Sequence, residues 1–252
     1  MADRYGRFKI KDKEFYGRIE GEEVRELDPG FPEKILPARG NYPLKDLSVL
    51  APIIPSKIIA VGLNYRDHAG ELNQPIPDEP VIFIKPSTSI LGPGEGIIYP
   101  PMARQVDYEA ELALVIKNKV FSLKPEEVKD HILGYTCFND VTARDLQKKD
   151  GQWTRSKSFN TFSPMGPFIV GRIDIKDLKI ELYLNGERRQ SSSTSNLIFG
   201  VETLVSFISQ VMTLLPGDVI TTGTPAGVGP VKRGDTVEVR IENIGSLVNY
   251  VE

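Results

Sequence analysis

The sequence predicts a mostly β fold with few helices. Short runs rich in β-branched and aromatic residues alternate with glycine and proline turns along the 252 residues, and one long stretch, 201–215, has helical periodicity. The composition also changes at residues 51–55, after a loop rich in proline and glycine. We therefore expect a small N-terminal domain over residues 1–54 and a main β domain over residues 55–252.

Composition limits the classes of function. The chain is 40% hydrophobic and 26% charged with a net charge of −3, so it lacks the basic excess of nucleic-acid-binding proteins. No apolar run reaches the roughly 18 residues of a membrane span, and the first residues lack the apolar centre of a signal peptide. We expect a cytoplasmic protein with neither nucleic acid nor membrane as a partner. The single cysteine, Cys137, is expected to be a buried thiol, and any metal must have oxygen ligands.

The expected elements begin with strands over 7–10 and 15–19, followed by a loop over 29–40. In the main domain, 57–62 is a short buried strand and 64–73 a helical turn. Further strands are expected over 81–85, 107–116 and 132–138, and short helices over 124–130 and 142–147, the last with a capping box formed by Thr142 and Asp145.

The C-terminal half contains the strongest local signals. Asn185-Gly186 predicts a tight hairpin, because both residues tolerate a positive φ. Over 201–215 apolar residues recur every three or four positions until Pro216-Gly217, which predicts a helix with a buried apolar face. A polar loop is expected over 153–157, and strands over 168–170, 179–184, 217–225, 236–241 and 247–251.

The stretch 107–116 combines acidic residues with an apolar tail. In a strand, side chains alternate between faces, so Asp107, Glu109 and Glu111 would share one face. Like charges repel, and unpaired charge is costly beside a core, so a positive partner is expected. A bound divalent cation and a solvated acidic strand end are the two interpretations that the pattern leaves open.

Four further residues have settings that suggest chemistry. His68 and Glu71 share one face of the predicted helical turn, where the acid can orient the imidazole of a general base, although a structural histidine is the alternative. Lys85 and Lys157 lie in apolar or aromatic surroundings, which suit either a solvated or an anion-binding lysine. The glycine-rich residues 222–229 lack the Lys-Ser/Thr of a phosphate loop, but their backbone can hold a small anion.

Six motifs in sequence order make the chain resemble the fumarylacetoacetate hydrolase family over about residues 55–252, close to its 2-hydroxyhepta-2,4-diene-1,7-dioate isomerase and acylpyruvase-like members. The motifs are Gly-Leu-Asn-Tyr-Arg-Asp-His-Ala-Gly-Glu (62–71), Phe-Ile-Lys-Pro-Ser-Thr-Ser (83–89), Asp-Tyr-Glu-Ala-Glu-Leu (107–112), Gly-Tyr-Thr-Cys-Phe-Asn-Asp-Val-Thr-Ala-Arg-Asp-Leu-Gln (134–147), Lys-Ser-Phe (157–159) and Thr-Gly-Thr-Pro-Ala-Gly-Val-Gly (222–229). The resemblance implies a catalytic domain of β-roll or β-sandwich type, preceded by the small extra domain of many members, and a homodimer.

The resemblance also implies the site. Glu109, Glu111 and Asp140 would bind one divalent cation, with Mg²⁺ expected first and Mn²⁺ or Ca²⁺ as alternatives. Asp107 would then lie outside the ligand set. The remaining roles are a catalytic set, His68, Glu71 and Lys157, and a substrate-binding set, Lys85, Arg144, Gln147 and Thr224. Asn160 departs from many bacterial relatives, which have Asp there, and bears on substrate choice.

Such a site stabilises the enolate of a small 2-oxo or 1,3-dicarbonyl acid. Hydrolytic carbon-carbon cleavage of an acylpyruvate-like or fumarylacetoacetate-like substrate is preferred, because a His-Glu base is suited to activating water. The alternative is isomerase, tautomerase or decarboxylase chemistry, of the aromatic-catabolism or oxaloacetate type. A third interpretation is a cation-binding module without turnover, which would leave His68, Glu71 and Lys157 without a role.

Overall fold

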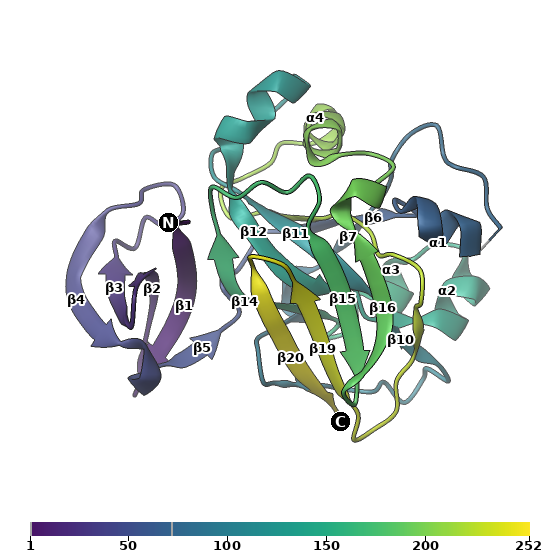
Figure 1. The fold of residues 1–252 in the computed structure, drawn as a ribbon, viewed down its shortest axis with the longest axis horizontal. Helices are drawn as coiled ribbons and strands as arrows, with labels where there is room; N and C mark the ends of the chain where they lie inside the picture. The colour runs from purple at the N-terminus through teal and green to yellow at the C-terminus, as the bar shows by residue number, and fades with distance from the viewer. Residues whose placement is uncertain (1, 72) are drawn as a thin grey trace.

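The computed structural model describes residues 2–71 and 73–252 and confirms the mostly β fold (Figure 1). Residues 1 and 72 lie outside the described residues, the second of them inside the helical turn expected over 64–73. The strands form sheets of twelve, five and three strands. In the described part of the chain, no helix is long and apolar enough to cross a membrane.

The N-terminal strands belong to the same sheet as the centre of the molecule (Figure 1). They are β1 (Arg4–Ile10), β2 (Lys13–Glu20), β3 (Glu23–Leu27), β4 (Pro37–Pro43) and β5 (Ser48–Leu50). β4 occupies part of the segment that was expected to be a loop, because pairing with β3 satisfies its backbone despite its glycine and prolines. β1 pairs with β14 and so joins this part to the rest of the sheet.

The main body is a sandwich of two sheets. In the large sheet the order continues through β14 (Ser163–Val170), β12 (Ile132–Asn139), β11 (Ala110–Ile116), β17 (Val219–Thr221), β6 (Ile58–Gly62) and β7 (Val81–Lys85), with β8 (Ile90–Leu91) beside β14. The five-stranded sheet consists of β16 (Glu187–Ser193), β15 (Lys179–Leu184), β19 (Thr236–Ile241), β20 (Gly245–Val251) and β9 (Gly96–Ile97). Leu112 and Leu114 of β11 share one core cluster with Ile180 and Val239 of the smaller sheet.

The acidic stretch 107–116 is two strands and not one. β10 (Val106–Tyr108) pairs with β13 (Thr142–Ala143) and β18 (Gly229–Pro230) in the three-stranded sheet, whereas β11 belongs to the large sheet. The chain changes sheets at Glu109, which belongs to neither strand. The expectation of three acids on one face of one strand is therefore wrong for Asp107.

Helices are few and short. They are α1 (Arg66–Glu71), α2 (Arg144–Asp150), α3 (Thr154–Lys157) and α4 (Val201–Val211), with 3₁₀ turns at Leu44–Asp46, Ser87–Ser89, Pro125–His131 and Thr194–Asn196. α3 lies where a polar loop was expected. The capping box expected before α2 is wrong, because the Thr142 hydroxyl donates to the Asp140 carbonyl and Asp145 accepts from the backbone amides of Arg104 and Gln105.

Three other expectations have clear outcomes. α4 ends at Val211, four residues early, and Val211 and Leu215 are exposed although the whole apolar stripe was expected to be core. The hairpin is confirmed, since Asn185 and Gly186 join β15 to β16 with positive φ at both residues. Cys137 is a buried thiol as expected, and burial raises its pKa to about 12.

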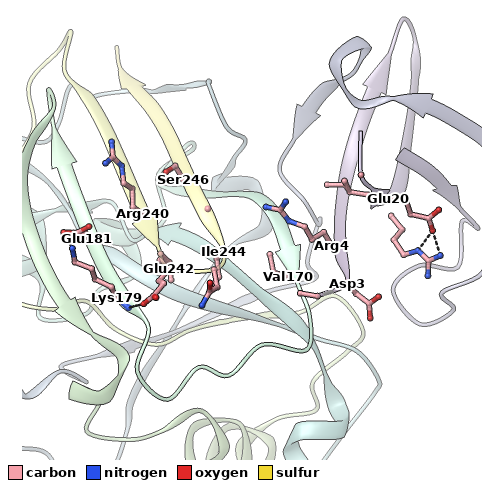
Figure 2. Close-up of a pocket in the computed structure, with 17 residues that line it drawn as sticks. Asp3, Arg4, Glu20, Val170, Lys179, Glu181, Arg240, Glu242, Ile244 and Ser246 are labelled. Carbon is pink, nitrogen blue, oxygen red and sulfur yellow. Dashed lines mark hydrogen bonds and ion pairs between the residues drawn. The ribbon is translucent and has the colours of Figure 1, made fainter. Parts of the chain in front are cut away.

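A groove of about 1260 Å³ lies between the N-terminal strands and the end of the five-stranded sheet where β19 turns into β20 (Figure 2). Its labelled charged residues carry both signs, and Arg4 reaches across the space from β1 (Figure 2). The groove shares no lining residue with the cavity that holds the acidic cluster, described next.

Candidate active site

Three buried carboxylates meet where β11 begins and β12 ends. Glu109 precedes β11, Glu111 lies within it, and Asp140 follows β12. The antiparallel pairing of the two strands brings these positions together, and the Asp140 amide donates to the Glu109 carbonyl at 2.8 Å. Each carboxylate offers an oxygen within 4.8 Å of the others. The three residues expected as metal ligands are thus gathered into one cluster.

Two of the acids are neutralised by basic side chains. Lys157 Nζ donates to Glu109 Oε2 at 2.8 Å and to Asp140 Oδ2 at 2.6 Å, and Arg144 forms an ion pair with the other oxygen of Glu109. Burial alone would raise the pKa of Glu109, but Lys157 and Arg144 outweigh it and lower the pKa to about 2. Glu109 is therefore an anion at neutral pH.

Arg144 also binds Asp107. Its Nε donates to Asp107 Oδ2 at 2.8 Å, and the side-chain amide of Gln105 donates to Asp107 Oδ1 at 2.9 Å. Asp107 is buried and is linked to Glu109 through Arg144. Its carboxylate is therefore held by protein groups, and it is not one of the three clustered acids.

Lys85 lies behind the cluster, out of reach of solvent. Its side chain is fully buried at 0% exposure, forms an ion pair with Asp140, and donates to the Phe162 carbonyl at 2.7 Å. Burial lowers the pKa of Lys85, although Asp140 opposes this effect. Lys85 was expected to line the substrate pocket, but the structure gives it contacts that orient Asp140, and it does not line the cavity.

Glu111 is the acid without a base. It is 1% exposed, and its Oε2 accepts a hydrogen bond from the Gly223 amide at 2.9 Å. Among the described residues no lysine or arginine is paired with it. Burial first, and then the charges of Asp140 and Glu109, raise its pKa well above the ordinary value of 4.5. Positive charge placed beside Glu111 would oppose this shift and lower its pKa.

The donor set fits a hard divalent cation. Carboxylate oxygens are the ligands that Mg²⁺, Mn²⁺ and Ca²⁺ prefer, and three acids in a buried cluster leave further coordination positions open. The missing positive partner of Glu111 is the observation that supports this fit, because an unpaired buried carboxylate is costly. Buried oxygen ligands next to a cavity are typical of an open catalytic site.

The cluster opens into a cavity of about 250 Å³. Eight of the ten residues predicted from sequence to have catalytic, substrate-binding or metal-binding roles line this cavity, and Lys85 and Glu71 do not. The lining comprises Val61, Gly62, Leu63, His68, Gln74, Phe83, Glu109, Glu111, Asp140, Arg144, Gln147, Lys148, Trp153, Lys157 and Thr224.

His68 and Glu71 form the pair that their spacing predicted. His68 Nδ1 lies 3.0 Å from Glu71 Oε2, and the Gly227 amide donates to the same carboxylate at 3.1 Å. Backbone amides of the glycine-rich loop 222–229 were expected to hold a small anion, and in the structure they bind the side-chain carboxyl groups of Glu71 and Glu111. His68 is left with Nε2 as the ring nitrogen available to the cavity.

Sequence reasoning missed the aromatic wall of the cavity. The rings of Phe83 and Trp153 lie edge to face with centroids 5.2 Å apart. A Cβ at Gly62 would lie 2.5 Å from the Trp153 ring, so only glycine leaves room for this wall. Gln190 was also missed; its amide nitrogen donates to Thr224 Oγ1 at 2.9 Å and its amide oxygen accepts from the Ala110 amide. Trp153 and Gln190 stand in none of the six motifs.

Comparisons with known proteins agree with this geometry. The family described as Fumarylacetoacetate (FAA) hydrolase C-terminal matches residues 57–252, and the family described as Rv2993c-like, N-terminal matches residues 3–52. The first match confirms the resemblance drawn from the six motifs.

Solved structures and curated relatives extend this finding. The chain is similar to the crystal structure of 2-hydroxyhepta-2,4-diene-1,7-dioate isomerase from Mycobacterium marinum, with a TM-score of 0.92 and 44% identity over 99% of this chain and 98% of that one. The structure of 5-carboxymethyl-2-hydroxymuconate delta-isomerase from Mycobacterium smegmatis has a TM-score of 0.93 and 44% identity, covering 98% of each chain. Oxaloacetate tautomerase Fahd2a, mitochondrial, from Rattus norvegicus is 45% identical over 221 residues, which are 83% of this chain and 71% of the relative.

Proposed function

The chain belongs to the fumarylacetoacetate hydrolase family, and on that premise we propose that it is a divalent-cation-dependent enzyme that enolises small 2-oxo acids. The observation that supports this most directly is that His68 and the cluster of Glu109, Glu111 and Asp140 line one cavity. Mg²⁺ is the cation proposed first. Held by the three acids, it would stabilise negative charge on the oxygen of an enolate.

The residues of this chain would move and balance the proton. His68 Nε2 removes a proton from the carbon next to the carbonyl, Glu71 holds Nδ1 and stabilises the imidazolium, and the same ring returns the proton to oxygen. Lys157 donates to Glu109 and Asp140 and holds both carboxylates in place beside the reacting end of the substrate. Phe83 and Trp153 exclude water from one side of the cavity.

Proton transfer alone would make the enzyme a tautomerase or isomerase. The functions named for three similar proteins, two isomerases and a tautomerase, support this outcome. Hydrolytic carbon-carbon cleavage, preferred from the sequence, remains the second candidate, because the His68–Glu71 pair can also activate a water molecule.

The test uses chelator-treated protein to which Mg²⁺, Mn²⁺ or Ca²⁺ is restored singly. Oxaloacetate and an acylpyruvate are supplied, and enol absorbance, pyruvate and carbon dioxide are followed separately. We expect cation-dependent interconversion of keto and enol forms, reduced at least about a hundredfold by His68→Gln. Release of a carboxylic acid and pyruvate would favour hydrolysis. If neither substrate is turned over in a cation-dependent way, the proposal that the protein is an enzyme for 2-oxo acids is refuted.

We also propose that the protein works in the cytoplasm as a homodimer, with a small 2-oxo acid as its partner and neither nucleic acid nor membrane. The net charge of −3 supports the absence of a nucleic-acid partner. Cell fractionation tests the location, and light scattering tests the assembly.

A further inference from the structure

One face of α2 lines the cavity and ends in a lysine without an acidic partner. Arg144, Gln147 and Lys148 occupy positions i, i+3 and i+4 of this helix, so their side chains share a face, and all three line the cavity. Arg144 is bound to Asp107 and Glu109. Lys148 is exposed and has no ion pair or side-chain hydrogen bond within the part of the chain that the structure describes.

The charges around the cavity favour an anionic ligand. Three acids of the cluster and three bases, Arg144, Lys148 and Lys157, line the space, so their formal charges cancel. Behind them, Asp107 and Lys85 contribute one charge of each sign, and Glu71 beside His68 contributes one negative charge. A bound divalent cation would therefore leave the site with a net positive charge, which attracts an anion.

Resting on the proposed function, we propose that Lys148 is a specificity-determining residue whose ammonium binds the second carboxylate of a 2-oxo dicarboxylic acid. Arg144 and Lys157 are already paired with cluster acids, so Lys148 is the lining base free to accept a new anion among the described residues. Gln147 assists, because its amide oxygen accepts from Arg144 Nη1 at 2.6 Å and its amide nitrogen remains a donor on the same face.

The separation of Arg144 and Lys148 along α2 predicts the length of the substrate. Four residues along α2 correspond to about 6 Å, so Lys148 stands one turn beyond Arg144, the residue that contacts Glu109. A short dicarboxylate spans this separation when its 2-oxo acid end lies at the cluster. A monocarboxylate of the same length would leave Lys148 without a partner.

A matched pair of ligands tests the inference by binding. 2-Oxoglutarate and 2-oxopentanoate have the same chain length and differ only in a terminal carboxylate or methyl group. Trp153 is the single tryptophan and lines the cavity, so its fluorescence reports binding to the Mg²⁺-loaded protein. We expect the wild type to bind the diacid about tenfold more tightly, since a charge-assisted contact in a partly desolvated site is of that order.

Variants then test whether Lys148 causes the preference for the diacid. Lys148→Gln should abolish the preference by weakening the diacid alone, and Lys148→Arg should keep most of it. Lys149→Gln is the control, because Lys149 is the next exposed lysine of α2 but does not line the cavity. With oxaloacetate as substrate, Lys148→Gln should raise KM about tenfold and leave kcat within about twofold, because the contact is the same in ground and transition states.

The outcomes separate the inference from the function on which it rests. If Lys148→Gln keeps the diacid preference, or Lys149→Gln loses it equally, Lys148 is not the determinant. If the wild type enolises oxaloacetate but binds both 2-oxo acids equally, the dianion selectivity is refuted and the proposed function stands. If the wild type neither binds nor turns over any 2-oxo acid, the proposed function fails as well.

Discussion

At the level of single residues, Glu109 and Glu111 are chemically identical and two positions apart, yet their surroundings are opposite. Glu109 is bound by Lys157 and Arg144, whereas Glu111 has a backbone amide and two neighbouring acids. The first carboxylate is stabilised as an anion by the protein itself. The second needs a cation that the described residues do not supply.

The same substitution should therefore have opposite effects at the two positions in metal-free protein. Glu109→Gln leaves two buried bases without their acid and should lower the free energy of unfolding by about 3 kcal/mol. Glu111→Gln removes a carboxyl whose ionisation is opposed by burial and by two neighbouring acids, and its amide oxygen can still accept from Gly223, so it should raise that energy by about 1 kcal/mol. Thermal unfolding in chelator measures both.

Added Mg²⁺ provides the control for this pair. It should raise the melting temperature of the wild type and of neither variant, because each variant lacks one ligand of the cluster. Equal signs for the two variants in chelator would contradict the electrostatic difference between them. Stabilisation of both by Mg²⁺ would show that the cation binds elsewhere.

The raised pKa of Glu111 also predicts a pH dependence. Above pH 4.5 the unfolded chain releases a proton that folded, metal-free protein retains, so the stability of the wild type falls as pH rises toward the raised pKa. Glu109, with a pKa of about 2, acts in the opposite sense and adds stability as pH rises from 2 to 4.5. Other groups titrate too, so the informative quantity is the difference in unfolding free energy between Glu111→Gln and wild type.

That difference should grow with pH above 4.5 at up to about 1.4 kcal/mol per pH unit, and it should shrink at saturating Mg²⁺. Denaturant unfolding at several pH values, with and without the cation, measures it. A difference that stays constant between pH 5 and 8 in chelator would mean that Glu111 titrates normally.

At the residue scale, sequence patterns alone predicted only part of the site. Carboxylates two apart before a core strand left a bound cation or a solvated strand end open, and a histidine three residues before a glutamate suggested a general-base pair. The roles of Asp140, Arg144, Gln147 and Thr224 were implied by the resemblance to the family. The contacts of Lys85 were not predictable, because nothing local distinguishes a lysine that contacts substrate from one that orients Asp140. Trp153 and Gln190 were missed for the same reason.

At the level of elements, the site depends on junctions between strands. Glu109 lies where the chain leaves the three-stranded sheet for the large one, and Asp140 lies just past the end of β12. Alternation of side chains predicted a single strand, because local sequence does not show that β10 and β11 have different partners. The end of α4 at Val211 was likewise not predictable from periodicity, which continues past it.

The contact between Gly62 of β6 and Trp153, the residue before α3, makes a prediction about cavity shape. Gly62→Ala would place a methyl group against the Trp153 ring and displace it, and the Trp153 carbonyl accepts the amide of Lys157 at 3.0 Å. We expect a loss of stability of about 1–3 kcal/mol from overpacking and a changed tryptophan emission. The apparent Kd for 2-oxoglutarate should rise about tenfold, since a displaced wall costs about 1.4 kcal/mol of binding.

Gly70→Ala is the matched control for this change. Apart from the backbone of α1 itself, none of the described residues has an atom within 4 Å of a Cβ at Gly70. Since the residue is inside α1, alanine should raise stability by about 0.5–1 kcal/mol and leave the emission of Trp153 unchanged. Unaltered emission and binding in Gly62→Ala would show that the ring does not depend on the glycine.

For the whole molecule, residues before the main domain share its core. Tyr5, Phe31 and Ile53 belong to one cluster with Val115 and Met165, and β1 extends the large sheet beyond β14. The division at residues 54 and 55 stays a prediction, because a change of composition marks a boundary in the sequence and cannot show how much surface crosses it. All residues that line the cavity come after that boundary.

The proposed homodimer has a candidate interface at the end of the large sheet. β7 is the last strand in its order, and its Val81 and Ile84 are 44% and 46% exposed, so an unpaired apolar edge faces solvent. A second copy that pairs along this edge would bury both side chains. We therefore expect a dimer by light scattering and a shift toward monomer in Ile84→Lys.

Phe121→Lys is the control, because Phe121 is 62% exposed and lies outside β7, beside α4, whose Ser209 carbonyl accepts from the Ser122 amide. It should leave the mass unchanged if the edge strand is the interface. A monomeric wild type would refute the homodimer, and a dimer broken only by Phe121→Lys would place the interface on the α4 side.

Phe83 of β7 lines the cavity and Lys85 of β7 is paired with Asp140, so a dimer through this edge would also hold the wall of the site in place. Ile84→Lys should therefore weaken 2-oxo acid binding together with assembly.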